Sequence, residues 1–179
     1  MMQALDLTFD RHTDERVRAE WETLRDAGLP SLAGHPGVTN RPHVTLDSRD
    51  HLAAEAEVGL GAVAARLPLD VRVGTVLLFH ATQRWVLARH VVVGRALLEL
   101  HEHVLSVLGR GGSPLTEPGR WVPHVTLARG LSDAQLSQAL TVVADSPPFT
   151  ATVLRLRRWD QPAGRAWDVP PQASAGRSL

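Results

Sequence analysis

Apolar and polar residues follow two spacings along the chain, and these predict its strands and helices. Residues 4–9 alternate in polarity and predict a strand. Residues 13–28 carry Val17, Trp21 and Leu24 at helical spacing, and the following Gly-Leu-Pro sequence is expected to end that helix. Further strands are expected at 43–46, 69–80, 85–93, 121–128, 149–159 and 166–169, and further helices at 50–67, 95–108 and 132–144.

Both halves of the chain show the same order of predicted elements: strand, helix, strand, helix, strand. We interpret this as an internal duplication, with one bilobal domain over residues 1–169 and lobes at about 1–80 and 84–169. The expected fold class is α+β: two mostly antiparallel sheets flank a central groove, and helices cover their outer faces. Whether the lobes exchange strands is left open. Residues 170–179 are predicted to form a flexible tail.

The tetrapeptide His-Val-Thr-Leu occurs in both halves, at 43–46 and 124–127, each time after a proline. Successive side chains of a strand point to opposite faces, so His and Thr share one face and Val and Leu share the other. The apolar pair is then free to pack on a core while the polar pair faces a groove. A strand duplicated for packing alone gives no reason to keep His and Thr on one face in both copies.

Two imidazoles and two hydroxyls in one groove suit displacement at phosphorus. That reaction takes a proton from the attacking oxygen, delivers one to the leaving oxygen and develops charge on the non-bridging oxygens. Histidine, with a reference pKa of about 6.5, can supply either proton function near neutrality. We therefore predict His43 and His124 as the acid–base pair and Thr45 and Thr126 as phosphate ligands, with no metal or other cofactor. The sequence does not say which histidine is the base.

This doubled motif, with about eighty residues between its copies, resembles the 2H phosphoesterase superfamily. Within it, the chain is most similar to the bacterial 2′-5′ RNA ligase-like proteins, also called RNA 2′,3′-cyclic phosphodiesterases, over about residues 4–169. The resemblance implies a bilobal fold and metal-independent opening of 2′,3′-cyclic phosphates, or reversible cleavage and joining of 2′-5′ linkages. It also implies that Arg129, shortly after the second motif, contacts phosphate.

One position departs from the bacterial relatives. They often have an aromatic residue five positions after the first motif histidine, where it can stack on a base, and this chain has Ser48 there. Base stacking is therefore expected from Phe79, Trp85 or Trp121, or is absent. Trp121 is expected to point away from the histidine face, which favours packing over stacking.

Composition adds limits to this interpretation. Hydrophobic residues make up 44% and charged residues 21% of the 179 residues, which is typical of a globular protein. Net charge is zero, so RNA binding would need a local patch. The absence of cysteine excludes disulfides, thiolate nucleophiles and cysteine-ligated metals. Without a signal-peptide pattern or an apolar run of about 18 residues, we expect a cytoplasmic monomer with no membrane segment and no obligate protein partner.

Other histidines and arginines are also candidates for a site. His101 and His103 lie two apart on an expected helix, about 200° apart around its axis, so they cannot chelate one ion and are expected at the surface. Arg155 and Arg157 share a strand face that either lines the groove or is solvated, and the sequence favours neither reading.

Together these features predict a metal-independent phosphodiesterase that hydrolyses 2′,3′-cyclic phosphates at RNA ends or on small nucleotides. One alternative is a non-catalytic module that binds a nucleotide or RNA end in the same groove. Another is a purely structural or partner-binding role. The neutral charge and Ser48 favour short substrates.

Overall fold

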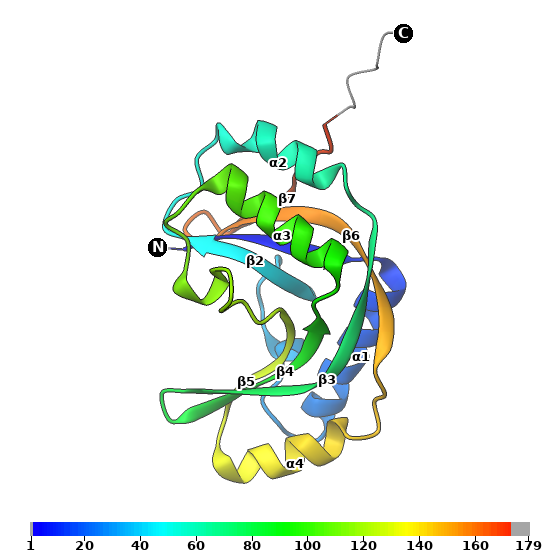
Figure 1. Cartoon of the computed structure of the whole chain (residues 1–179). Helices are drawn as coiled ribbons and strands as arrows, with labels where there is room; N and C mark the ends of the chain where they lie inside the picture. Colours follow the sequence, from blue (N-terminus) through cyan, green and yellow to red (C-terminus); the bar gives the residue numbers. More distant parts are fainter. Residues whose placement is uncertain (1, 173–179) are drawn as a thin grey trace, which may run out of the picture.

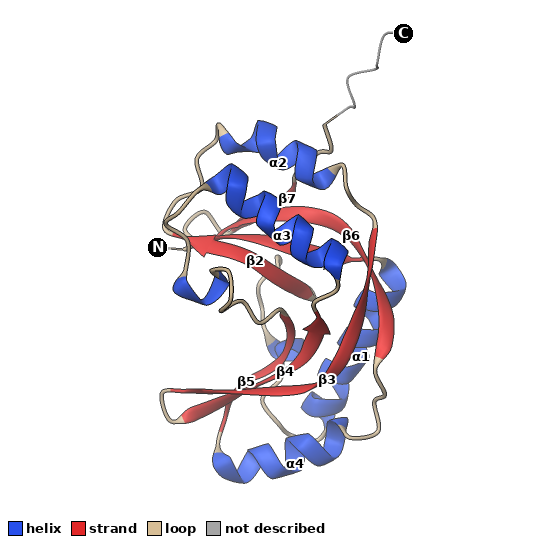
Figure 2. Cartoon of the chain, viewed as in Figure 1, coloured by secondary structure: helices blue, strands red, loops and turns tan. Residues whose placement is uncertain are grey.

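The chain forms seven β-strands and four α-helices within residues 2–172, the part that the computed structural model describes (Figures 1 and 2). The strands are β1 (Gln3–Phe9), β2 (His43–Arg49), β3 (Leu69–Ala81), β4 (Arg84–Val92), β5 (His124–Leu131), β6 (Phe149–Asp160) and β7 (Arg165–Asp168). The helices are α1 (Arg11–Asp26), α2 (Ala56–Ala64), α3 (Arg95–Leu108) and α4 (Asp133–Val143), with short 3₁₀ turns η1 (Leu32–Gly34) and η2 (Pro114–Thr116).

All strand pairs are antiparallel, and the sheet order is β2-β1-β6-β3-β4-β5, with β7 beside β6. The α+β prediction is confirmed, and the structure adds that the two expected sheets are continuous, because β3 pairs with β6. We call β2-β1-β6 the first lobe and β3-β4-β5 the second. Strand β6 comes from the second half of the chain but lies in the first lobe, and β3 lies in the second lobe although it comes from the first half.

Helices cover the sheet in a similarly crossed arrangement. Helix α3, from the second half of the chain, packs against β2, and α1, from the first half, packs against β5 and α4 (Figure 1). The two edge strands, β2 and β5, also contact each other. The sheet therefore curls until its edges, which carry the two motifs, lie together.

Helix α2 is shorter than the predicted 50–67 and contains two glycines that weaken a helical pattern. Packing explains one of them: a Cβ at Gly59 would lie 2.7 Å from Val107 Cγ1 on α3. The other, Gly61, accepts a hydrogen bond from the Gln172 amide through its carbonyl, at 2.9 Å. Of the predicted tail, residues 170–172 thus lie beside α2, and the rest falls outside the described residues.

No helix within residues 2–172 is both long and apolar enough to cross a membrane.

Candidate active site

The two motif strands show the expected alternation. Their four apolar side chains, Val44, Leu46, Val125 and Leu127, are buried in the core. His43 and Thr45 on β2 and His124 on β5 are partly exposed on the other face, whereas Thr126 on that face is nearly buried.

Both motif histidines are held in the same way. The Nδ1 atom of His43 lies 2.8 Å from the Arg41 carbonyl oxygen, and the Nδ1 atom of His124 lies 2.8 Å from the Val122 carbonyl oxygen. A carbonyl only accepts, so each Nδ1 carries the proton and donates it. Each ring therefore keeps Nε2 for proton exchange with a substrate. The same two-residue spacing occurs in both motifs, and in each a proline with fixed φ stands between the carbonyl and its histidine.

The electrostatic surroundings link the two motifs. The pKa of His124 lies below its ordinary value, chiefly because burial disfavours the charged ring. The positive charges of Arg129 and His43 lower this pKa further, against the opposing effect of the Val122 carbonyl. Arg129 and His43 thus both lie close enough to His124 to affect its charge, although His43 comes from the other edge strand.

A β-bulge places Arg129 on the face of the motif. Arg129 lies three residues after Thr126, and in a regular strand these two side chains would point to opposite faces. Thr126 pairs with Ala88 and Ala128 pairs with Leu87, so β5 has one extra residue and the alternation is reset. Arg129 then pairs with Val86 on the same face as Thr126, and its side chain is exposed.

The two motif threonines differ in their surroundings. The Thr45 hydroxyl donates to Asp6 Oδ1 at 3.0 Å, and Arg157 donates to Asp6 Oδ2 at 3.0 Å and to the Thr39 carbonyl at 3.0 Å. In the second lobe the residue opposite Thr126 is Ala88, which offers no acceptor side chain. The Thr126 hydroxyl has no hydrogen-bond partner within the described residues, so it is the threonine that is ready to donate to a bound anion.

The surroundings of Asp6 and His90 do not follow from the sequence. Asp6 occupies the polar position of an alternating strand, which predicts a solvated side chain, yet it is buried under Arg157. His90 lies on β4 directly opposite His124, and residues directly opposite in an antiparallel pair share a face. No sequence signal would have found the strand register that brings these two histidines together.

The three arginines of β6, Arg155, Arg157 and Arg158, lie in three different environments. Arg157 is buried against Asp6, and Arg158 points to the opposite face, where it pairs with Glu57 on α2. Arg155 lies in register with Thr8, which itself pairs with His43, and its exposed side chain lies 3.5 Å from Asp168. Arg157 is thus a structural support of the first motif rather than a free phosphate ligand.

Two tryptophans tie the motif strands to the other half of the chain. The Trp21 indole on α1 donates to the Thr126 carbonyl at 3.0 Å, and the Trp121 indole donates to the Thr45 carbonyl at 2.9 Å. A buried carbonyl on an edge strand needs a partner, and each indole supplies one. The packing role expected for Trp121 is confirmed.

We expect Trp121→Phe to lower the free energy of unfolding by about 1–3 kcal/mol, because it leaves the Thr45 carbonyl without its donor. Trp21→Phe should act similarly on the Thr126 carbonyl. Chemical denaturation measures both effects. Trp85→Phe is the control, since its indole bond to Asp133 is exposed and should contribute less than about 0.5 kcal/mol. If the Trp121→Phe protein were as stable as this control, the hydrogen bond from Trp121 to Thr45 would not stabilise the first motif strand.

The surface position expected for His101 is wrong. Its ring is buried and stacks on Trp121, with centroids 3.9 Å apart and an angle of 11° between the rings. Burial lowers the pKa of His101, against opposing effects of the Thr116 and Leu46 carbonyls and of the Asp47 and Glu102 charges. Leu97, Leu100 and Val104 are the buried neighbours on the same helix, so His101 belongs to the apolar stripe of α3.

This lowered pKa predicts a loss of stability in acid. The unfolded chain binds the His101 proton more readily than the folded one, so stability present above about pH 6.5 is lost as the pH falls below that value. His101→Phe keeps a ring on Trp121 but does not titrate. We expect the fall in unfolding free energy between about pH 7.5 and pH 5 to be smaller in this variant than in the wild type. Equal pH slopes would contradict the assignment.

A family model described as the 2′-5′ RNA ligase superfamily matches residues 13–165. This match spans most of the chain, including both motifs. The chain belongs to the 2′-5′ RNA ligase superfamily. Membership in this superfamily of 2H phosphoesterases supports an enzyme of phosphodiesterase or ligase type.

Solved structures agree with this assignment at the level of fold. The structure of E. coli LigT complexed with 3′-AMP has a TM-score of 0.57 at 21% identity, with 95% of this chain and 94% of that chain covered. A structure described as a phosphoesterase has a TM-score of 0.56 at 20% identity, with 96% and 95% covered. E. coli LigT in apo form gives 0.55 at 22% identity, with 96% and 94% covered. No curated protein matches the chain by sequence.

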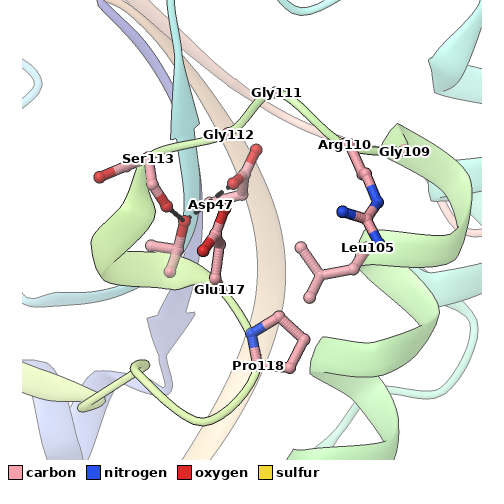
Figure 3. A pocket seen from close by; sticks show the side chains of 10 residues that line it. Asp47, Leu105, Gly109, Arg110, Gly111, Gly112, Ser113, Glu117 and Pro118 are labelled. Carbon is pink, nitrogen blue, oxygen red and sulfur yellow. Dashed lines mark hydrogen bonds between the residues drawn. The ribbon is translucent and has the colours of Figure 1, made fainter.

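A separate cavity of about 350 Å³ lies beside the loop between α3 and β5 (Figure 3). It is lined by that loop, by Leu105 and by Asp47, which pairs with core residue Leu5 and so lies on the face of β2 opposite to Thr45. Thr116 and Arg49 hydrogen-bond the Asp47 carboxylate. This cavity is therefore separate from the groove face that carries the two His-Val-Thr-Leu motifs. Within residues 2–172 there is also no cluster of three or more histidine and acidic residues placed to hold a metal ion.

Proposed function

We propose that this chain is a phosphodiesterase that hydrolyses 2′,3′-cyclic phosphates on RNA ends or small nucleotides without a metal. The observation that carries the proposal is the matched pair of motif histidines, each fixed through Nδ1 and each presenting Nε2. Superfamily membership supports the class of chemistry. E. coli LigT, which has the same fold, has been crystallised with 3′-AMP and with phosphate, ligands of the same chemical kind.

The proposed step is an in-line displacement by water. The base takes a proton from water as its oxygen bonds to phosphorus, the bond from phosphorus to one ribose oxygen breaks, and the acid delivers a proton to that oxygen. The lowered pKa of His124 keeps its ring neutral at pH 7, which suits the base. His43 then serves as the acid, and the two histidines exchange roles when the step runs in reverse and closes the cyclic phosphate with release of water.

Charge on the non-bridging oxygens would be stabilised mainly from the second lobe. Arg129 is exposed on the motif face, and the Thr126 hydroxyl is uncommitted among the described residues. Thr45 donates to phosphate only if its O–H turns away from Asp6, after which Asp6 remains paired with Arg157. Both motifs come from one chain, so the proposed site needs no second subunit and its partner is the nucleotide or RNA end alone.

The proposal is tested by incubating the protein with uridine 2′,3′-cyclic phosphate in excess EDTA and analysing the product. We expect turnover to a single uridine monophosphate, and a 2′-phosphate would show that the bond to the 3′-oxygen breaks. Loss of turnover in EDTA with rescue by a divalent metal would reject the mechanism. Saturable binding without any product would instead favour the non-catalytic binding module.

A further inference from the structure

An aromatic ring lies against one of the two motif histidines. Phe79 on β3 is half-buried, and its ring centroid lies 4.7 Å from that of His124, with 49° between the ring planes. The two residues are separated by strand β4, whose side chains on this face are Val86, Ala88 and His90. The small Ala88, opposite Thr126, leaves room for the two rings to approach each other across β4.

Strand register places this ring on the motif face. Phe79 pairs with Val86, and Val86 pairs with Arg129, so the three side chains form one row across β3, β4 and β5. Phe79 thus belongs to the row that carries the exposed arginine, and its ring also contacts the motif histidine His124. A nucleotide whose phosphate is held by Arg129 and Thr126 has its ribose and base within reach of Phe79.

The other aromatic candidates are committed elsewhere. Trp121 is stacked on His101, and its N–H is bonded to the Thr45 carbonyl. Trp85 lies on the opposite face of the β3–β4 hairpin, where it packs on His80 and donates to Asp133 at the start of α4. Among these aromatic side chains, Phe79 is therefore the one that faces the motif.

The first lobe offers no equivalent beside its own histidine. By register, Trp159 occupies the place in β6 that Phe79 occupies in β3, because it pairs with Ala4 and Ala4 pairs with Ser48. The Asp6–Arg157 ion pair lies in the row between Trp159 and His43. Within the described residues, Phe79 is the only phenylalanine or tryptophan whose ring contacts a motif histidine.

We propose that Phe79 is the stacking platform for the nucleobase of the substrate, which makes the second lobe the base-binding side of the groove. This inference rests on the proposed function. A phenyl ring offers no hydrogen-bonding edge, so it recognises that a base is present rather than which base it is. Base preference should therefore be modest and follow stacking area, with purines somewhat favoured over pyrimidines.

The test compares substrates with and without a base. For adenosine 2′,3′-cyclic phosphate, Phe79→Leu should lower kcat/KM by about 5- to 150-fold, the range expected for the loss of one base–aromatic stack. For the ribose 2′,3′-cyclic phosphate that lacks a base, the same variant should lose much less. Phe79→Trp should retain the preference for the base-containing substrate. Trp159→Leu is the matched control and should leave the ratio of the two substrates unchanged.

Equal losses on both substrates would overturn the inference and show that Phe79 only supports His124. Unchanged rates on both would overturn it as well. If the wild type turned over neither substrate, the proposed function would fail, and binding would test the platform separately. In that case Phe79→Leu should weaken adenosine 2′-monophosphate binding while inorganic phosphate binding stays the same. Parallel weakening of both ligands would then reject the platform.

Discussion

His124→Ala should lower kcat/KM for a 2′,3′-cyclic nucleotide by about 10²–10⁴-fold, and His43→Ala should do the same, because each variant removes one proton-transfer group. Removal of both histidines should cost less than the product of the two single losses, since the base and the acid act in one step. Steady-state kinetics on the two single variants and the double variant measure these effects.

Folding must be unaffected for that result to bear on the chemistry. Both rings lie partly exposed at the motif face, so their truncation leaves the core intact. Thermal denaturation and circular dichroism should show folded proteins. His12→Ala, at an exposed position on α1, is the matched control and should keep full activity. A near-normal rate in either motif variant would remove that histidine from the acid–base pair.

Asp6→Ala should lower the free energy of unfolding by about 3–5 kcal/mol, because it leaves the buried Arg157 guanidinium without its counter-charge. The two side chains are 2% and 6% exposed, so little water reaches the charge left behind. The Thr45 hydroxyl also loses its acceptor. Urea denaturation monitored by tryptophan fluorescence measures the loss.

Two further variants separate this effect from ordinary truncation. The double variant Asp6→Ala with Arg157→Leu should recover part of the lost stability, because no buried charge then remains unpaired. Glu15→Ala breaks the exposed pair with Arg11 and should change stability by less than about 1 kcal/mol. If Asp6→Ala behaved like Glu15→Ala, the buried network would have no role in holding the first motif.

The sequence predicted the α+β class through the repeated order of elements in its two halves, and each tetrapeptide predicted a strand with one apolar face. It also contained the signal for the buried His101, which continues the stripe of Leu97, Leu100 and Val104 on α3. The expected surface position came from the general frequency of histidine at protein surfaces, although the helical spacing of His101 indicates burial. Helix α2 is shorter than predicted although it continues through both glycines, one of which is required by the close approach of α3.

Other features depend on pairing between distant segments, which periodicity does not encode. Asp6 and Arg157 are neighbours only because β6 lies beside β1, and Phe79 reaches His124 only because β3 joins the second lobe. The side chain of Arg129 faces the motif because of a β-bulge, and the residue types around that bulge do not predict it. The superfamily resemblance implied a role for Arg129, and the structure supplies the geometry that makes the role possible.

The central claim is that imidazoles from both motif strands act on one bound phosphate. It is tested most directly by NMR of the protein carrying ¹⁵N-labelled histidine, titrated with uridine 2′-monophosphate and assigned with His43→Gln and His124→Gln. We predict that the Nε2 signals of His43 and His124 both shift, with one shared dissociation constant and a stoichiometry of one nucleotide per chain. A nucleotide that shifts only one of these rings, or shifts them with two different affinities, would contradict the account.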